Sequence, residues 1–157
     1  MISDLDERLR RAANLGVEAL TDLGCELAEG GRLVEAEVCF RRASENGSAR
    51  ASFNLGNCLA EQQRWLEAVT AFEVAIGRGD SEALVNLGWV LHELGDLAGE
   101  IRAFHSAEMA GESGGPLGLA LALREKGDRD AALAAGQRPG AAGARAGSRC
   151  AACWPWL

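Results

Sequence analysis

The side chains of this chain with the most distinctive chemistry are those of its cysteines. Cys150 and Cys153 have the spacing of zinc ligands and of redox-active pairs. A structural zinc site needs four ligands, and no second pair of Cys or His residues follows the same pattern. A thioredoxin-like motif would also require a strand that leads into a helix, which the surrounding sequence does not provide. The sequence therefore predicts no metal site and no cofactor.

Three further cysteines are expected to pack as small apolar side chains in a reducing compartment. They are Cys25, Cys39 and Cys58. No pairing of a nucleophile with a base and no phosphate-binding loop occurs in the chain, so we predict that it is not an enzyme. The acidic N-terminus lacks the cationic start and apolar stretch of a signal peptide, which favours a cytoplasmic location.

A constant repeat period organises most of the chain. A Leu-Gly pair, a Phe and an Ala recur in register in three successive units, and the spacing between successive members is the same for all three features. The sets are Leu23-Gly24, Leu55-Gly56 and Leu87-Gly88, then Phe40, Phe72 and Phe104, then Ala43, Ala75 and Ala107. Self-similarity at such a period indicates stacked supersecondary units that bury their apolar faces against one another.

Each unit is expected to contain two amphipathic helices, because its apolar residues recur at helical spacing. The expected first helices are 17–29, 49–61, 82–94 and 116–126, the second helices are 33–45, 65–77, 97–110 and 129–135, and a leading helix covers 4–13. Gly95-Asp96 and Gly127-Asp128 have the composition of a left-handed helix end followed by an N-cap. Ser48 and Ser81 are further candidate N-caps.

The repeated glycines are interpreted as packing residues. Gly costs about 1 kcal/mol relative to Ala inside a helix, so a close approach between helices must compensate for it. We expect Ala36 and Ala68 to lie opposite these glycines, and the repeated Phe side chains to fill the space between neighbouring units. Glu100 stands where the first two units have Ala36 and Ala68, so the third hairpin is expected to pack less tightly.

The predicted domain organisation follows from the repeat. It comprises a cap helix in 1–16, a repeat domain in 17–135 and a flexible tail rich in Ala, Gly and Arg in 136–157. The units of the repeat domain are 17–48, 49–80, 81–112 and an incomplete 113–135.

This pattern resembles the tetratricopeptide (TPR) repeat. The matching residues in the second unit are Leu55-Gly56, Gln63 in the usual Gly place, Ala68, Phe72 and Ala75. The connector 43–51 is equally similar to the Sel-like variety of the same superfamily. The resemblance implies an all-α fold, a right-handed superhelix of about three and a half antiparallel hairpins, that acts as a protein-interaction scaffold.

The same resemblance implies that the first helices line a concave groove that binds a peptide or protein segment. The residues placed on this face are Asp22, Asn54 and Asn86 before the Leu-Gly pairs, Phe53 and Val85 beside them, Cys25, Asn57 and Trp89 one turn later, and His92. Two interpretations of Asn54 and Asn86 stand with equal weight. Their amides could bind the backbone of an extended peptide, or they could form hydrogen bonds between adjacent helices of the protein itself.

The net charge of the chain limits the class of partner that it can bind. All 23 acidic residues lie in 1–135 with 13 of the 16 basic residues, a net charge of −10 in that part. Nucleic acids and anionic membranes attract basic surfaces, so neither is predicted as a partner. The places where chaperone-binding TPR domains use Lys and Arg to hold a carboxylate contain Thr21, Glu82 and Asn86. A basic or neutral segment is therefore expected in the groove.

Two alternative functions remain open. The repeats could be a regulatory part of a larger enzyme or signalling protein, or they could assemble with themselves. Self-association through the C-terminal end is expected if the helix at 116–126 leaves apolar side chains exposed. The relevant side chains are Leu117, Leu119, Leu121 and Leu123.

Overall fold

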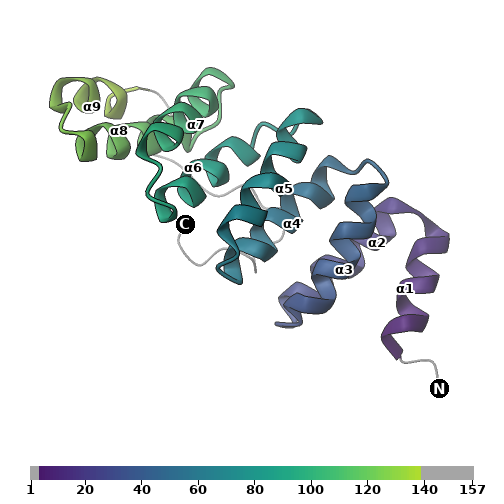
Figure 1. Ribbon diagram of the computed structural model, residues 1–157. Helices are drawn as coiled ribbons and strands as arrows, with labels where there is room; N and C mark the ends of the chain where they lie inside the picture. Colours follow the sequence, from purple (N-terminus) through teal and green to yellow (C-terminus); the bar gives the residue numbers. More distant parts are fainter. Residues whose placement is uncertain (1–3, 139–157) are drawn as a thin grey trace.

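In the computed structural model, which describes residues 4–138, helices follow one another in stacked hairpins without any strand in that range (Figure 1). The helices are α1 (Asp4–Leu15), α2 (Val17–Glu29), α3 (Leu33–Glu45), α4 (Ala49–Glu61), α5 (Trp65–Gly77), α6 (Ala83–Glu93), α7 (Leu97–Met109), α8 (Gly115–Lys126) and α9 (Arg129–Gly136). The predicted all-α solenoid of antiparallel hairpins is confirmed. Most of the predicted tail, including Cys150 and Cys153, lies outside the described residues.

Consecutive helices pack against each other along the whole array, in the order of the sequence. The first helices of the units also contact one another, α2 with α4, α4 with α6 and α6 with α8. Among the described residues, no two second helices of neighbouring units make comparable contact. The first helices therefore form the more closely spaced inner row, and the second helices form the outer row.

The helix ends follow the turn chemistry of the sequence, with one exception. Gly95 and Gly127 have positive φ angles of 72° and 89°, and the side chains of Asp96 and Asp128 each accept a hydrogen bond from a backbone N–H of the next helix. Ser48 caps α4 in the same way, through the N–H of Ala51. The prediction for Ser81 is wrong, because α6 begins at Ala83 and the Ser81 hydroxyl is hydrogen-bonded to the Glu112 carboxylate instead.

Each repeated Phe packs over the repeated Gly of its own hairpin. A Cβ atom added to Gly24, Gly56 or Gly88 would lie only 2.6, 2.5 or 2.7 Å from a ring atom of the Phe on the second helix of the same hairpin. Phe40, Phe72 and Phe104 are completely buried in these positions. The Phe rings were expected between neighbouring units, but each ring packs inside its own hairpin. Phe104 also contacts a glycine of the following unit, Gly118.

Charged side chains join the outer helices of the first two units. Glu37 on α3 forms ion pairs with Arg41, at 2.8 Å, and with Arg64, at 2.7 Å, while Glu67 on α5 pairs with both arginines. Burial raises the pKa of Glu37, but hydrogen bonds and charge from the two arginines outweigh it, so this pKa lies below its ordinary value.

No helix in the described part of the chain is long and apolar enough to cross a membrane.

Candidate functional site

The predicted partner-binding residues lie on the inner row, on helices α2, α4 and α6. Their exposure differs widely. Asp22 and His92 are exposed, Cys25, Val85 and Trp89 are half-buried, and Phe53, Asn54, Asn57 and Asn86 are buried. Helix α4 is buried at every residue of the run 51–60. The inner row thus presents its exposed polar groups towards its two ends and its buried amides in the middle.

The asparagine side chains link neighbouring units through a repeated hydrogen bond. Nδ2 of Asn54 donates to Sγ of Cys25 at 3.3 Å, and Nδ2 of Asn86 donates to Oδ1 of Asn57 at 2.7 Å. Both bonds join the same two places of successive units, because Cys25 and Asn57 are one repeat period apart, as are Asn54 and Asn86. In the structure, the amides of Asn54 and Asn86 thus form hydrogen bonds between the first helices of neighbouring units, which is the second of the two interpretations.

One polar atom in this ladder has no partner. Asn54 has no exposed surface, and its Oδ1 atom accepts no hydrogen bond among the described residues. A buried amide oxygen in a folded protein normally accepts at least one hydrogen bond. Asn54 therefore differs from Asn86 in having a buried carbonyl oxygen for which the described residues provide no donor.

The ladder changes at the third interface. The residue in the place of Cys25 and Asn57 is Trp89, and the residue in the place of Asn54 and Asn86 is Gly118, which has no side chain to donate. The indole ring instead packs edge-on against Phe104, with ring centroids 5.1 Å apart. Its Nε1 atom is buried without an acceptor among the described residues.

Phe53 also packs into the core. Its ring lies edge-on to Phe72, with centroids 6.0 Å apart, and only 5% of the residue is exposed. Its predicted place among the partner-binding residues would require this contact to open.

Asp22 is held by an arginine from the next unit. Nη1 of Arg50 lies 2.9 Å from a carboxylate oxygen of Asp22 and 3.2 Å from one of Glu18. Two acidic side chains thus share one cation at the exposed end of the inner row. This local excess of negative charge is consistent with a basic partner.

The buried cysteines have unreactive thiols. Cys39 and Cys58 have no exposed surface, and burial raises the pKa of both thiols to about 11. Because the thiolate is the reactive form, neither residue has the environment of a nucleophile or redox centre.

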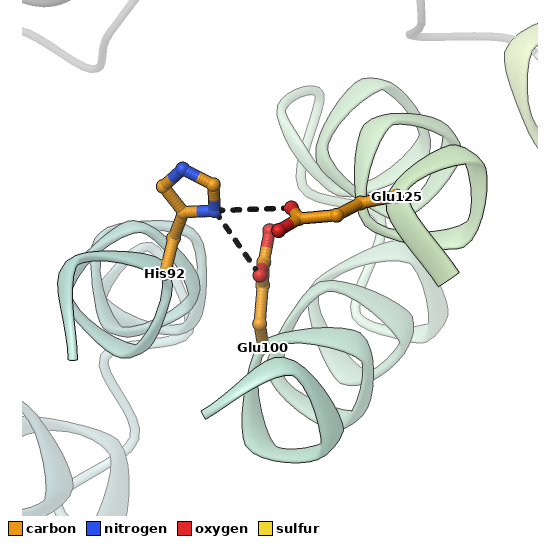
Figure 2. Close-up of side chains that lie close together, drawn as sticks. All are labelled: His92, Glu100 and Glu125. Carbon is orange, nitrogen blue, oxygen red and sulfur yellow. Dashed lines mark hydrogen bonds and ion pairs between the residues drawn. The ribbon is translucent and has the colours of Figure 1, made fainter. Parts of the chain in front are cut away.

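His92, the last of the predicted site residues, lies in a cluster that crosses three helices. Figure 2 shows its ring on α6 facing the carboxylates of Glu100 on α7 and Glu125 on α8. Nδ1 of His92 lies 3.3 Å from Oε2 of Glu100 and 3.6 Å from Oε2 of Glu125. The cluster borders a cavity of about 450 Å³, which is also lined by Trp89, Leu121 and Arg124.

Glu100 and Glu125 were missed as site residues in the sequence. The available signal was Glu100 itself, which interrupts a place that the two earlier units fill with Ala36 and Ala68. Glu100 is only 2% exposed, and burial raises the pKa of its carboxyl, an effect that the adjacent His92 partly opposes. Its proximity to Glu125 depends on how α7 and α8 pack, which the repeat alone does not specify.

Comparisons with known proteins agree with this architecture. Residues 21–83 match the sequence model of the tetratricopeptide repeat family. A crystal structure of MamA is 21% identical, superposes with a TM-score of 0.71, and the match covers 86% of this chain and 91% of that chain. A second MamA crystal structure is 24% identical with a TM-score of 0.69, covering 84% and 79%.

A third structure, MamA MSR-1 C2, is 19% identical with a TM-score of 0.62, covering 81% of this chain and 78% of that chain. No curated protein matches the chain in sequence. At these identities the structural likeness establishes a shared fold.

Proposed function

We propose that this chain is a protein-interaction scaffold that binds a peptide or protein segment along the inner row of helices, since residues 21–83 match the tetratricopeptide repeat family. The proposed contact face comprises α2, α4 and α6. It has no chemistry of its own, and the partner supplies the activity that the scaffold positions.

The unpaired oxygen of Asn54 is the observation that carries this proposal. An extended peptide presents backbone N–H groups that must find acceptors when they leave water. Oδ1 of Asn54 is an acceptor without a donor among the described residues, at the middle of the inner row. Because Asn54 has no exposed surface, a peptide could reach this oxygen only after neighbouring side chains change rotamer, a kind of change that is common at interfaces.

The charge of the inner row supports a basic or neutral segment. Glu18 and Asp22 are exposed at one end of this row, and Glu93 is exposed at the other. Complementary charges on a partner would speed its association and favour one register.

Site-specific photocrosslinking tests the location of the contact. A benzophenone amino acid placed at Asp22, on the inner row, should crosslink a partner in source-cell extract. The matched control is the same amino acid at Glu73, an exposed acidic residue on the outer helix α5. Crosslinking of the same partner at position 73 but not at position 22 would refute the inner-row assignment.

The segment found by crosslinking then provides a peptide for a direct measurement. Replacing Asn54 by Ala should lower the affinity for this peptide by roughly 2- to 10-fold, since one hydrogen bond contributes about 0.5–1.5 kcal/mol. If wild type and Asn54→Ala bind the peptide with equal affinity, the amide of Asn54 does not contact it as proposed.

Self-assembly is the second candidate function. Of the leucines expected at this end, Leu117 on α8 is 36% exposed but Leu119 is buried, and Leu133 on α9 is 65% exposed, so the last described hairpin presents part of the expected apolar surface. Size-exclusion chromatography with light scattering decides this alternative, since a strict monomer at high concentration excludes it. A regulatory role within a larger enzyme would instead predict that the crosslinked partner is a catalytic subunit.

A further inference from the structure

The side chains of His92, Glu100 and Glu125 have the composition of a transition-metal site. They supply one imidazole nitrogen and two carboxylates, from α6, α7 and α8. Imidazole and carboxylate are both ligands of Zn²⁺, and a zinc ion bound by three protein side chains keeps a fourth position for water. Ca²⁺ takes six to eight oxygen ligands, so a site with three side chains including a histidine does not suit it.

The distances between the three side chains fit one ion. For Zn–N and Zn–O bonds of about 2.1 Å, a tetrahedral site places neighbouring ligand atoms roughly 3.4 Å apart. Nδ1 of His92 lies 3.3 and 3.6 Å from the nearest oxygens of the two carboxylates. One ligand atom from each of the three residues can be chosen so that all lie within 4.8 Å of one another. Small rotations of the exposed His92 and Glu125 side chains would complete the geometry.

The burial of Glu100 provides an independent argument for a cation. A carboxylate is costly to remove from water unless a charge or hydrogen bonds compensate for it. Glu100 occupies the place of a fully buried Ala in the first two hairpins, and only 3% of its side chain is exposed. Its hydrogen-bond partner is the single imidazole of His92, so a divalent ion would compensate this buried charge more fully.

The cavity beside the cluster has room for an ion and its bound water. The His92 and Glu125 side chains are 44% and 56% exposed, which leaves an entry path for the ion. The Nε1 atom of Trp89, a donor with no acceptor among the described residues, belongs to a residue that lines the same cavity. Arg124 adds one positive charge to the wall of the cavity, and the combined negative charge of the two carboxylates is larger.

We propose that His92, Glu100 and Glu125 bind a divalent transition-metal ion, with Zn²⁺ as the ion that best fits these ligands. Two carboxylates and a neutral imidazole give a site with no net charge once the ion is bound. The ion would connect the third hairpin, α6 and α7, to the first helix of the following unit. This inference is independent of binding along the inner row.

Zinc titration of the full chain tests the proposal. Replacing Cys150 and Cys153 by Ser in every protein removes the thiolate ligands that would compete for the ion. Calorimetry with Zn²⁺ should then show one ion per chain, and Mg²⁺ at the same concentration should not bind. The Co²⁺ complex should have the visible bands of a four-coordinate ion without thiolate charge transfer.

Two variants should weaken Zn²⁺ binding at least 10-fold. Glu100→Ala restores the residue of the first two hairpins and is expected to fold, and His92→Gln changes an exposed residue. The matched control is His105→Gln, which removes a histidine that pairs, within residues 4–138, with the single carboxylate of Glu108 at 3.5 Å. Its Zn²⁺ affinity should equal that of the parent protein.

A structural readout distinguishes this site from adventitious binding. Zn²⁺ should raise the melting temperature of the parent and slow amide exchange in α8, and neither change should occur in Glu100→Ala. The proposal is overturned if the parent binds no Zn²⁺, if His92→Gln binds it as tightly as the parent, or if exchange in α8 is unaffected. Melting of Glu100→Ala in the presence of a chelator confirms that this variant is folded.

Discussion

At the scale of single residues, the two asparagines of the inner row have different surroundings in spite of their equivalent places. Nδ2 of Asn86 donates to the oxygen of another buried amide, whereas Nδ2 of Asn54 donates to a sulfur atom, which is a weak acceptor. The repeat period places both on one face. The repeat period does not reveal that Asn86 bonds to a second buried amide, whereas Asn54 has a carbonyl oxygen without a donor among the described residues.

Asn86→Ala should therefore destabilise the protein more than Asn54→Ala. Removing Asn86 leaves Oδ1 of Asn57 buried without its donor, at a cost of about 1–3 kcal/mol. Removing Asn54 deletes an unpaired oxygen along with a weak hydrogen bond. Urea unfolding measures both free energies, and an equal or larger loss in Asn54→Ala would contradict the distinction between the two amides.

Glu100 makes stability depend on pH in a defined direction. Burial holds the pKa of this carboxyl above its ordinary value of about 4.5, so the folded state binds its proton more tightly than the unfolded state. The free energy of unfolding should then fall as the pH rises from about 4.5 through the raised folded pKa. His92, Glu125 and Arg124 are the other ionisable groups that border the same cavity.

Glu100→Gln isolates this contribution, because it keeps the shape and removes the titrating group. With a chelator present, the stability of the variant relative to wild type should increase as the pH rises above 4.5, then level off. Urea unfolding at a series of pH values gives this difference. A difference that does not change with pH, or that grows as the pH falls, would show that burial of Glu100 carries no penalty.

At the scale of helices, the Gly–Phe contact determines how closely the two helices of a hairpin approach. Three hairpins repeat it, with the Phe ring occupying the volume that a methyl group on the glycine would need. Sequence reasoning identified both residues as packing residues. It did not pair them within one hairpin, because a sequence separation of half a repeat period is compatible with contacts inside a unit and between units.

Two glycine substitutions test this packing. Gly56→Ala should destabilise the protein by about 1–3 kcal/mol, since the added methyl would overlap the ring of Phe72 at 2.5 Å. Gly77→Ala, at the end of α5, meets no heavy atom within 4 Å and should stabilise by about 0.4–1 kcal/mol. Thermal or urea unfolding measures both, and stabilisation by Gly56→Ala would contradict the close approach.

At the scale of the whole molecule, burial is concentrated in the middle of the array. Helix α4 has ten consecutive buried residues, while α1 has two and α9 has one. In a repeat array each unit is stabilised mainly by its neighbours, so the terminal helices have fewer stabilising contacts.

Hydrogen exchange should reflect this gradient. Amides in α4 and α5 should exchange slowest, and those in α1 and α9 fastest, because terminal helices open without the rest of the array. Mass spectrometry of deuterium uptake measures each helix in a metal-free sample. Uniform protection from α1 to α9 would instead indicate that the array unfolds as one cooperative unit.

The sequence by itself determined the class and the layout of this protein. The constant repeat period, the helical spacing of its apolar positions and the Gly-Asp turns specify stacked hairpins, since these signals act within a helix or between adjacent helices. Tertiary structure decided the contacts between units. The unpaired oxygen of Asn54, the change of the ladder at Trp89 and Gly118, and the meeting of Glu100 with His92 and Glu125 all depend on the relative placement of helices from different units, and local sequence signals do not encode that placement.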